Sequence, residues 1–219
     1  MPSSVKSIVV GARASKLSQV QVQEIQSFFP DLEFELLLVK TTGDNDLQTS
    51  LRTLDKTDFF TKEIDQMLLE GKCRIAIHSA KDLPDPLPLG LKVVALTKGV
   101  DPRDMLVYNC DPLPLGAKIG TSSIRREHNL LEWRPDLNCV DIRGTIEQRL
   151  AQLDAGIVDG LVMAEAALIR LGLTYRRRMP IHGEVAPLQG RLAVVARVDD
   201  IEMDELFAKI EYREKGSKM

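Results

Sequence analysis

The chain has 219 residues, enough for one large or two small domains with a substantial core. Hydrophobic residues make up 44% of it, charged residues make up 28%, and the formal net charge is −3. This balance excludes the basic excess typical of general nucleic-acid binding, although it allows a local basic crevice. No apolar run could span a bilayer, and the N-terminal stretch lacks the apolar core of a signal peptide, so we expect a cytoplasmic protein without membrane partners.

Short apolar runs alternate with segments of helical periodicity along the chain. Strands are predicted at 7–10, 33–39, 74–78, 91–96, 104–108, 117–120, 138–142, 160–164 and 191–197. Helices are predicted at 15–29, 61–71, 122–132, 145–156, 165–171 and 201–211. Strands that alternate with helices of about ten residues indicate βαβ units and mostly parallel sheets, so the fold class is α/β.

Two segments interrupt this rhythm. Residues 97–104, TKGVDPRD, contain Gly and Pro and are a plausible crossing between two α/β units. Residues 41–58 are polar and unpatterned, and a loop of that length inside a compact domain is usually functional or mobile.

The chain has three cysteines, Cys73, Cys110 and Cys139. They are widely spaced and include no CxxC pair, so we expect neither a disulfide framework nor a zinc site. Their simplest interpretation is as three small hydrophobic residues in a reducing compartment.

Polar and cationic side chains follow four of the predicted strands. They are Arg13 and Ser15; His78, Ser79, Lys81 and Asp82; Ser123, Arg125 and Arg126; and Arg143 and Arg149. Ligands of open parallel sheets bind beyond the carboxyl ends of the strands. Helix N-termini offer N–H groups to an anion, and arginine offers a planar fork that matches a carboxylate. One such turn is more often a solvated surface feature, but four of them converging on one crevice predict a ligand with several carboxylates. A phosphate ligand is less favoured because no GxxxxGK[ST] loop is present.

Asp82 brings a carboxylate into this cationic set. Before Pro84 it could simply form a turn, or it could stabilise a developing cation or transfer a proton. Lys81 could be its ion-pair partner or a substrate contact. His78 is most simply a hydrogen-bonded histidine at a strand end rather than a base.

Together these motifs closely resemble those of the porphobilinogen deaminase, or hydroxymethylbilane synthase, family. The matching segments, in family order, are GARASKLSQVQ, TTGD, FFTKEID, RIAIHSAKDLPDPLPLGL, DPRD, IGTSSIRRE, DIRGTIEQRL, LVMAEAALIRLGL and LQGRLAVVAR. They cover residues 7 to about 200. The combination of HS-x-KD-x-P, GTSS-x-RR and RG-x₅-RL is highly specific.

The resemblance implies a transferase of tetrapyrrole and haem biosynthesis that joins four porphobilinogens head to tail, releasing ammonia each time, to give hydroxymethylbilane. It also implies a dipyrromethane cofactor attached to a cysteine of a third domain. The first two domains of the family resemble type II periplasmic binding proteins, are doubly wound and are connected by a hinge. Here we expect domain 1 at 1–98, domain 2 at 102–187, and a return to domain 1 over 188–219.

The resemblance further implies the roles of site residues. The catalytic aspartate of the family falls on Asp82, which would steady the positive charge as ammonia leaves. The residues that would bind carboxylates of the substrate and cofactor are Arg13, Ser15, Gln21, Lys62, Lys81, Ser123, Arg125, Arg126, Arg143 and Arg149. No metal is implied.

The chain also departs from the family pattern. It stops shortly after the return to domain 1, so we expect the third α+β domain and its cofactor cysteine to be absent. None of its three cysteines occupies the family position. Thr57 and Asp58 replace a lysine and a glycine, Leu188 replaces the first glycine of Gly-Gln-Gly, and Arg191 stands where a small residue is usual.

Three interpretations remain open. The chain could be a shortened deaminase that is primed differently, a non-catalytic two-domain binder of porphobilinogen, a tetrapyrrole or another polycarboxylate, or a fragment of a longer protein. Loss of a domain would expose apolar surface on the other two domains, so a homodimer is also possible.

Overall fold

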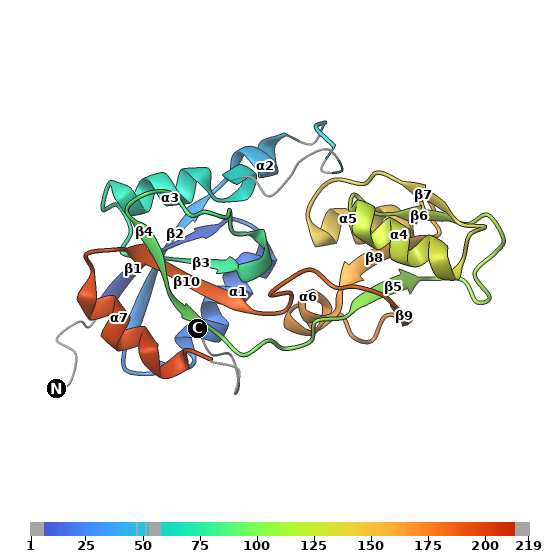
Figure 1. Ribbon diagram of the computed structural model, residues 1–219. Coiled ribbons are helices and arrows are strands. Elements are labelled where there is room, and N and C mark those ends of the chain that lie inside the picture. The colour runs from blue at the N-terminus through green and yellow to red at the C-terminus, as the bar shows by residue number, and fades with distance from the viewer. Residues whose placement is uncertain (1–6, 47, 51, 53–57, 213–219) are drawn as a thin grey trace. The chain divides into compact units, whose positions relative to one another are not determined.

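The computed structural model describes residues 7–46, 48–50, 52 and 58–212 (Figure 1). The chain divides into two compact units. The first comprises Met1–Gly43, Lys56–Val100 and Arg191–Met219, and the second comprises Asp44–Asp55 and Asp101–Gly190. Part of the loop expected at 41–58 lies outside the described residues, and the functional domain boundaries at 1–98, 102–187 and 188–219 stay predictions.

The first unit is built on a five-stranded sheet in the order β2-β1-β3-β10-β4. Its strands are β1 (Ser7–Arg13), β2 (Glu33–Val39), β3 (Ile75–Ser79), β4 (Leu91–Leu96) and β10 (Leu192–Arg197). Strand β1 pairs in parallel with β2 and β3, whereas β10 runs antiparallel to β3 and β4. Because β1 and β3 are parallel, their carboxyl ends, Arg13 and Ser79, lie at the same edge of the sheet.

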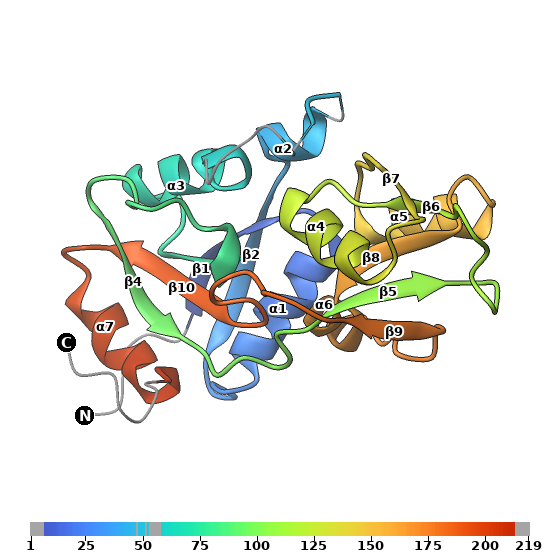
Figure 2. The same cartoon turned by 45° about the vertical axis from the view of Figure 1, so that its right-hand side comes forward.

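Helices cover both faces of this sheet (Figure 2). On one face, α1 (Lys16–Gln26) and α7 (Ile201–Phe207) bury Ile25 and Phe207 against Val10 and Val194. On the other face, α3 (Lys62–Leu69) packs its apolar side, including Leu68, onto the sheet. Each buried aliphatic side chain stabilises this arrangement by about 1.5–3 kcal/mol relative to an exposed one.

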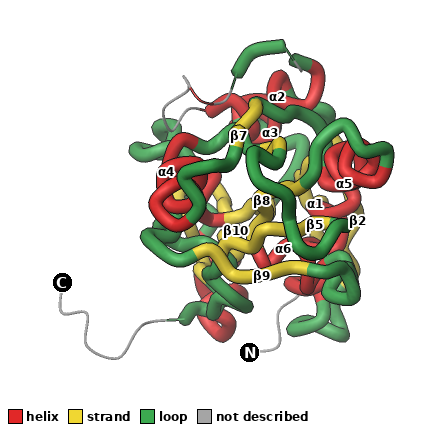
Figure 3. Tube along the Cα trace, turned by 90° about the vertical axis from the view of Figure 1, so that its right-hand side faces the viewer, coloured by secondary structure: helices red, strands yellow, loops and turns green. Residues whose placement is uncertain are grey.

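The second unit repeats the design with the strand order β7-β6-β8-β5-β9. Its strands are β5 (Asp104–Tyr108), β6 (Lys118–Gly120), β7 (Asn138–Val140), β8 (Gly160–Ala164) and β9 (Arg178–Ile181). Strand β6 is parallel to β7 and β8, and β5 is antiparallel to β8 and β9. Helix α4 (Ile124–Trp133) packs on one face, and α5 (Ile146–Asp154) and α6 (Glu165–Arg170) pack on the other. Figure 3 shows β5, β7, β8 and β9 between α4 and α5.

The predicted α/β class with two doubly wound units is confirmed. The predicted helix at 201–211 is shorter, because α7 ends at Phe207 and a 3₁₀ turn, η4 (Ala208–Ile210), follows. Strand β9 and the short helix α2 (Thr42–Asn45) were not predicted. No helix in the described part of the chain is long and apolar enough to cross a membrane.

Candidate active site

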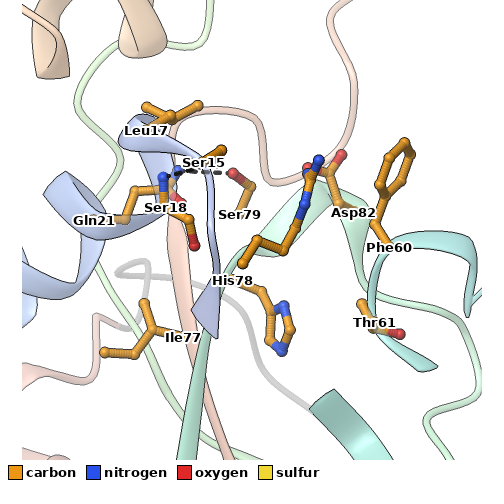
Figure 4. A pocket seen from close by; sticks show the side chains of 11 residues that line it. Ser15, Leu17, Ser18, Gln21, Phe60, Thr61, Ile77, His78, Ser79 and Asp82 are labelled. Atoms are coloured by element: carbon orange, nitrogen blue, oxygen red, sulfur yellow. Dashed lines mark hydrogen bonds between the residues drawn. The ribbon is translucent and has the colours of Figure 1, made fainter. Parts of the chain in front are cut away.

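A pocket lies in the first unit, at the carboxyl ends of β1 and β3 (Figure 4). It is formed by the β1–α1 turn, the start of α3 and the 3₁₀ helix η3 (Ala80–Asp82) that follows β3. The lining residues are Arg13, Ser15, Leu17, Ser18, Gln21, Phe60, Thr61, Ile77, His78, Ser79 and Asp82. The structure thus brings together four of the predicted site residues, namely Arg13, Ser15, Gln21 and Asp82.

Local hydrogen bonds hold the α1 side of the pocket. The hydroxyl of Ser15 accepts a hydrogen bond from the amide of Ser18 at 3.3 Å, so Ser15 is the N-cap of α1. The amide nitrogen of the buried Gln21 side chain donates to the Ser79 hydroxyl at 2.8 Å, which joins α1 to the end of β3. Ser15 and Gln21 therefore shape the pocket through these hydrogen bonds, whatever ligand contact they also make.

Arg13 is positioned by an aromatic ring. Its guanidinium lies over Phe60, 4.5 Å from the ring centroid. The ring can pack here because residue 43 is glycine, since a Cβ at Gly43 would lie 2.3 Å from the Phe60 ring. The TTGD and FFTKEID motifs thus act together, and the Thr42 amide also donates to the Glu63 carboxylate at 2.8 Å.

Asp82 is the last residue of η3, and its exposed side chain faces the same pocket as Arg13. A carboxylate beside a guanidinium in a pocket can balance a cation that forms on a bound ligand.

His78 corrects one expectation. Its side chain is 5% exposed, and among the described residues its Nε2 atom has no hydrogen-bond partner. The prediction of a hydrogen-bonded strand-end histidine is therefore wrong for this atom. Burial, together with the positive charge of Arg13, lowers the pKa of His78 to about 4, so the ring is neutral at pH 7.

The second unit holds the predicted arginines that follow β6. Ser123 caps α4 by accepting a hydrogen bond from the Arg126 amide at 3.4 Å. Arg125 and Arg126 both bind one buried carboxylate, that of Asp104 at the start of β5. The two guanidinium groups lower the pKa of Asp104 against the effect of its burial.

The predicted arginines that follow β7 lie near the start of α5. Arg143 donates to the backbone carbonyl of Asp46 at 2.6 Å, and Arg149 donates to the carbonyl of Gly144 at 2.9 Å. Ser122 connects this loop to the β6–α4 turn, because its hydroxyl bonds to the backbone of Ile142. The second unit therefore gathers Ser123, Arg125, Arg126, Arg143 and Arg149 at the N-terminal ends of α4 and α5 and in the turns that precede them. Convergence of these residues with the pocket of the first unit stays a prediction.

Two other predicted residues stand apart from the pocket lining. Lys62 is the exposed first residue of α3, and Lys81 is half-buried within η3.

Sequence reasoning missed Asp104 and Gln189 as partners of the arginines. The only available signal was the acidic residue of DPRD at the beginning of a buried strand, where an unpaired charge would be costly.

The three cysteines lie outside the pocket lining. Cys73 is buried, and desolvation raises the pKa of its thiol to about 11. Desolvation likewise raises the pKa of the half-buried Cys139 to about 11, and Cys110 is exposed beyond the end of β5. Groups of three or more potential metal ligands were not found among the described residues.

Comparison of the sequence with known families gives a match over residues 8–205 to the porphobilinogen deaminase, dipyromethane cofactor binding domain. The chain is 39% identical over 218 residues to a porphobilinogen deaminase of Desulforudis audaxviator, covering 94% of this chain and 71% of the relative. It is 39% identical over 209 residues to a probable porphobilinogen deaminase of Chlamydia pneumoniae, covering 92% of this chain and 88% of the relative.

Solved structures with a similar fold include binding proteins and a regulatory domain. The OxyR2 regulatory domain of Vibrio vulnificus matches with a TM-score of 0.54 at 16% identity, over 96% of each chain. An amino acid ABC transporter substrate-binding protein of Streptococcus pneumoniae, bound to L-arginine, matches with a TM-score of 0.51 at 15% identity, over 94% of this chain and 86% of that one. At such low identity these matches show the fold alone, and they confirm the resemblance to type II periplasmic binding proteins.

Proposed function

This chain belongs to the porphobilinogen deaminase family, and on that premise we propose that it condenses four porphobilinogens with loss of ammonia to give hydroxymethylbilane. The activity is that of a transferase in tetrapyrrole and haem biosynthesis. The observation that carries the proposal is the pocket in which Asp82 and Arg13 stand together at the carboxyl ends of β1 and β3. It supplies both a carboxylate for a cation and a guanidinium for an anion.

The residues of the chain take distinct roles in this proposal. Arg13, together with the N-terminus of α1 capped by Ser15, binds carboxylate groups of the substrate. Asp82 stabilises the cation that forms on the pyrrole as ammonia departs. The further carboxylate-binding residues are Gln21, Lys62, Lys81, Ser123, Arg125, Arg126, Arg143 and Arg149.

The dipyrromethane cofactor of the family supplies an acceptor pyrrole when it is bound. The arginines and helix N-termini suit its carboxylates, but none of the three cysteines lines the pocket, so they do not suit its covalent attachment there. Cys73 is 1% exposed, and an added Cβ on Gly11 would lie 2.8 Å from its Sγ, so the thiol is enclosed by packing. We therefore derive no step through a cofactor attached to these cysteines.

The pocket that contains Arg13 and Asp82 also favours a second candidate, a non-catalytic binder of porphobilinogen or another polycarboxylate. Such a binder would use the same cationic groups and would need no anchored acceptor. It differs from the enzyme in releasing no ammonia from bound porphobilinogen.

Incubation with porphobilinogen separates the two functions. We expect ammonia release and, after acid oxidation, uroporphyrin from the wild type, and loss of both in Asp82→Ala. Asp85→Asn is the matched control, because Asp85 is an exposed carboxylate of the same segment outside the pocket lining. Tight binding without ammonia release would support the binder instead, and an intact mass raised by two pyrroles would show a covalent cofactor.

Two further expectations belong to this proposal. We propose that the protein acts in the cytoplasm, where porphobilinogen would be its small-molecule partner. Homodimerisation also stays a prediction, and sedimentation velocity over a range of protein concentrations would test it.

A further inference from the structure

One buried carboxylate organises two of the predicted substrate-binding arginines. Asp104 is 2% exposed. One of its oxygens accepts a hydrogen bond from Nη2 of Arg125 at 2.7 Å, and the other accepts from Nε of Arg126 at 2.9 Å. The Arg126 Nη2 atom is also 2.7 Å from this second oxygen. Neighbouring arginines of α4 are thereby attached to the first residue of β5.

A third side chain fixes the carboxylate itself. The amide of Gln189 donates to Asp104 at 3.0 Å and to the backbone carbonyl of Pro102 at 2.5 Å. Gln189 is 4% exposed and stands between two residues of positive φ, Leu188 at 59° and Gly190 at 86°. The backbone thus adopts an uncommon conformation on either side of the residue that holds Asp104.

The ion pair with Asp104 does not use all the N–H donors of Arg125. Arg125 donates hydrogen bonds through one nitrogen to Asp104 and through another to the carbonyl of Glu184, whereas a guanidinium carries five N–H donors. Two guanidinium groups and one carboxylate also keep a net charge of about +1. The Arg125 side chain is 26% exposed, so a ligand carboxylate can reach it.

We propose that Asp104, supported by Gln189, is a positioning residue that holds Arg125 and Arg126 in the orientation in which they bind a carboxylate of the substrate. The proposal rests on the function proposed above for the identity of that substrate. An unanchored arginine loses rotamer freedom when it binds, whereas an anchored one has already lost it on folding. Asp104 would thus increase the affinity for an anion despite its own negative charge.

The direction in which the affinity for porphobilinogen changes distinguishes a positioning role of Asp104 from an effect of its charge alone. Asp104→Asn removes a negative charge beside the arginines, so an effect through charge alone would tighten the binding of porphobilinogen. Positioning predicts the opposite, a roughly tenfold rise in the Kd measured by titration calorimetry at pH 7.5. The side-chain ¹⁵Nε–H signal of Arg126, whose Nε donates to Asp104, should also lose its protection from exchange in this variant.

Glu165→Gln is the matched control. Glu165 is a buried carboxylate of the same unit, and it pairs through two contacts of 2.8 Å with Arg178, which is not one of the predicted site arginines. We expect this variant to lose stability while its Kd for porphobilinogen changes less than twofold. Equal changes of Kd in the two variants would overturn the proposal, and so would tighter binding by Asp104→Asn.

Gln189→Leu keeps the test decisive if Asp104→Asn does not fold, because it leaves the carboxylate and both guanidinium charges in place and removes only the support from Gln189. We expect its Kd for porphobilinogen to rise about threefold, and an unchanged Kd would contradict the proposal. Failure of the wild type to bind porphobilinogen would refute the proposed function instead. In that case the ¹⁵Nε–H signal of Arg126 would still report whether Asp104 immobilises this arginine, and an unchanged signal in Asp104→Asn would overturn the inference.

Discussion

The guanidinium of Arg13 lies over the ring of Phe60, 4.5 Å from the ring centroid, and both residues line the pocket that contains Asp82. The ring supports the cation from one side. A cation–π contact of this kind contributes about 0.5–1 kcal/mol at a partly exposed site.

Phe60→Leu should weaken porphobilinogen binding by about two- to fivefold, because the side chain stays apolar but the cation–π contact is lost. Titration calorimetry measures the change. Phe28→Leu is the control, since Phe28 is exposed and outside the pocket lining. An unchanged Kd in Phe60→Leu would show that the ring does not position Arg13.

Leu188→Gly should raise the free energy of unfolding by about 1 kcal/mol. Leu188 has a φ of 59°, a left-handed conformation that costs a residue with a Cβ roughly 1–2 kcal/mol and glycine almost nothing. Urea denaturation measures the change. The contrasting variant is Gly190→Ala, which should be destabilising because its Cβ would lie 2.7 Å from the carbonyl oxygen of Asp101. A destabilised Leu188→Gly would contradict this account.

The pH dependence of stability should report His78. Burial and Arg13 lower the pKa of His78 to about 4 from 6.5, so between these values the unfolded chain binds a proton that the folded chain does not. The contribution of His78 to the free energy of unfolding is complete above pH 6.5 and falls by about 3 kcal/mol as the pH drops to 4. Urea denaturation across this range should show a shallower fall in His78→Gln. The exposed His128→Gln should follow the wild type, and identical curves for all three proteins would refute the assignment.

Arg191→Ala should lower the free energy of unfolding by about 1–2 kcal/mol. The Arg191 guanidinium donates to the carbonyl oxygens of Thr97 at 2.7 Å and Tyr212 at 2.8 Å, and it lies 5.5 Å from the Tyr212 ring centroid. It therefore fastens the end of the described chain to the segment after β4. Arg177→Ala, which removes an exposed ion pair with Asp111, should change stability by less than about 0.5 kcal/mol. Equal changes in the free energy of unfolding of the two variants would mean that the Arg191 contacts contribute no more than an exposed ion pair.

The repeating elements could be predicted because their burial is periodic. Strands 33–39, 91–96, 104–108 and 160–164 have the bounds that their apolar runs indicate. Strand β9 escaped notice because it has only four residues and includes Pro180, which is tolerated where β9 ends the sheet. The antiparallel direction of β10 depends on how the chain returns to the first unit, and local pattern does not encode that.

The candidate site was only partly predictable. The residues that follow strands, such as Arg13 and Asp82, could be found because the carboxyl ends of parallel strands collect ligand-binding groups. The partners of these residues come from distant parts of the chain, and no spacing rule connects Asp104 to Gln189 or Gly43 to Phe60. The missing hydrogen bond of His78 Nε2 likewise depends on tertiary packing.

The most direct test of the proposed function is the rate of ammonia release from porphobilinogen, with wild type and Asp82→Asn compared at equal occupancy of the site. Equal occupancy, set from the Kd of each protein, removes any difference in binding. The account predicts ammonia release by the wild type and a loss of at least a hundredfold in Asp82→Asn, since the amide cannot balance the developing cation. Release at the same rate by both proteins, or by neither, would contradict it.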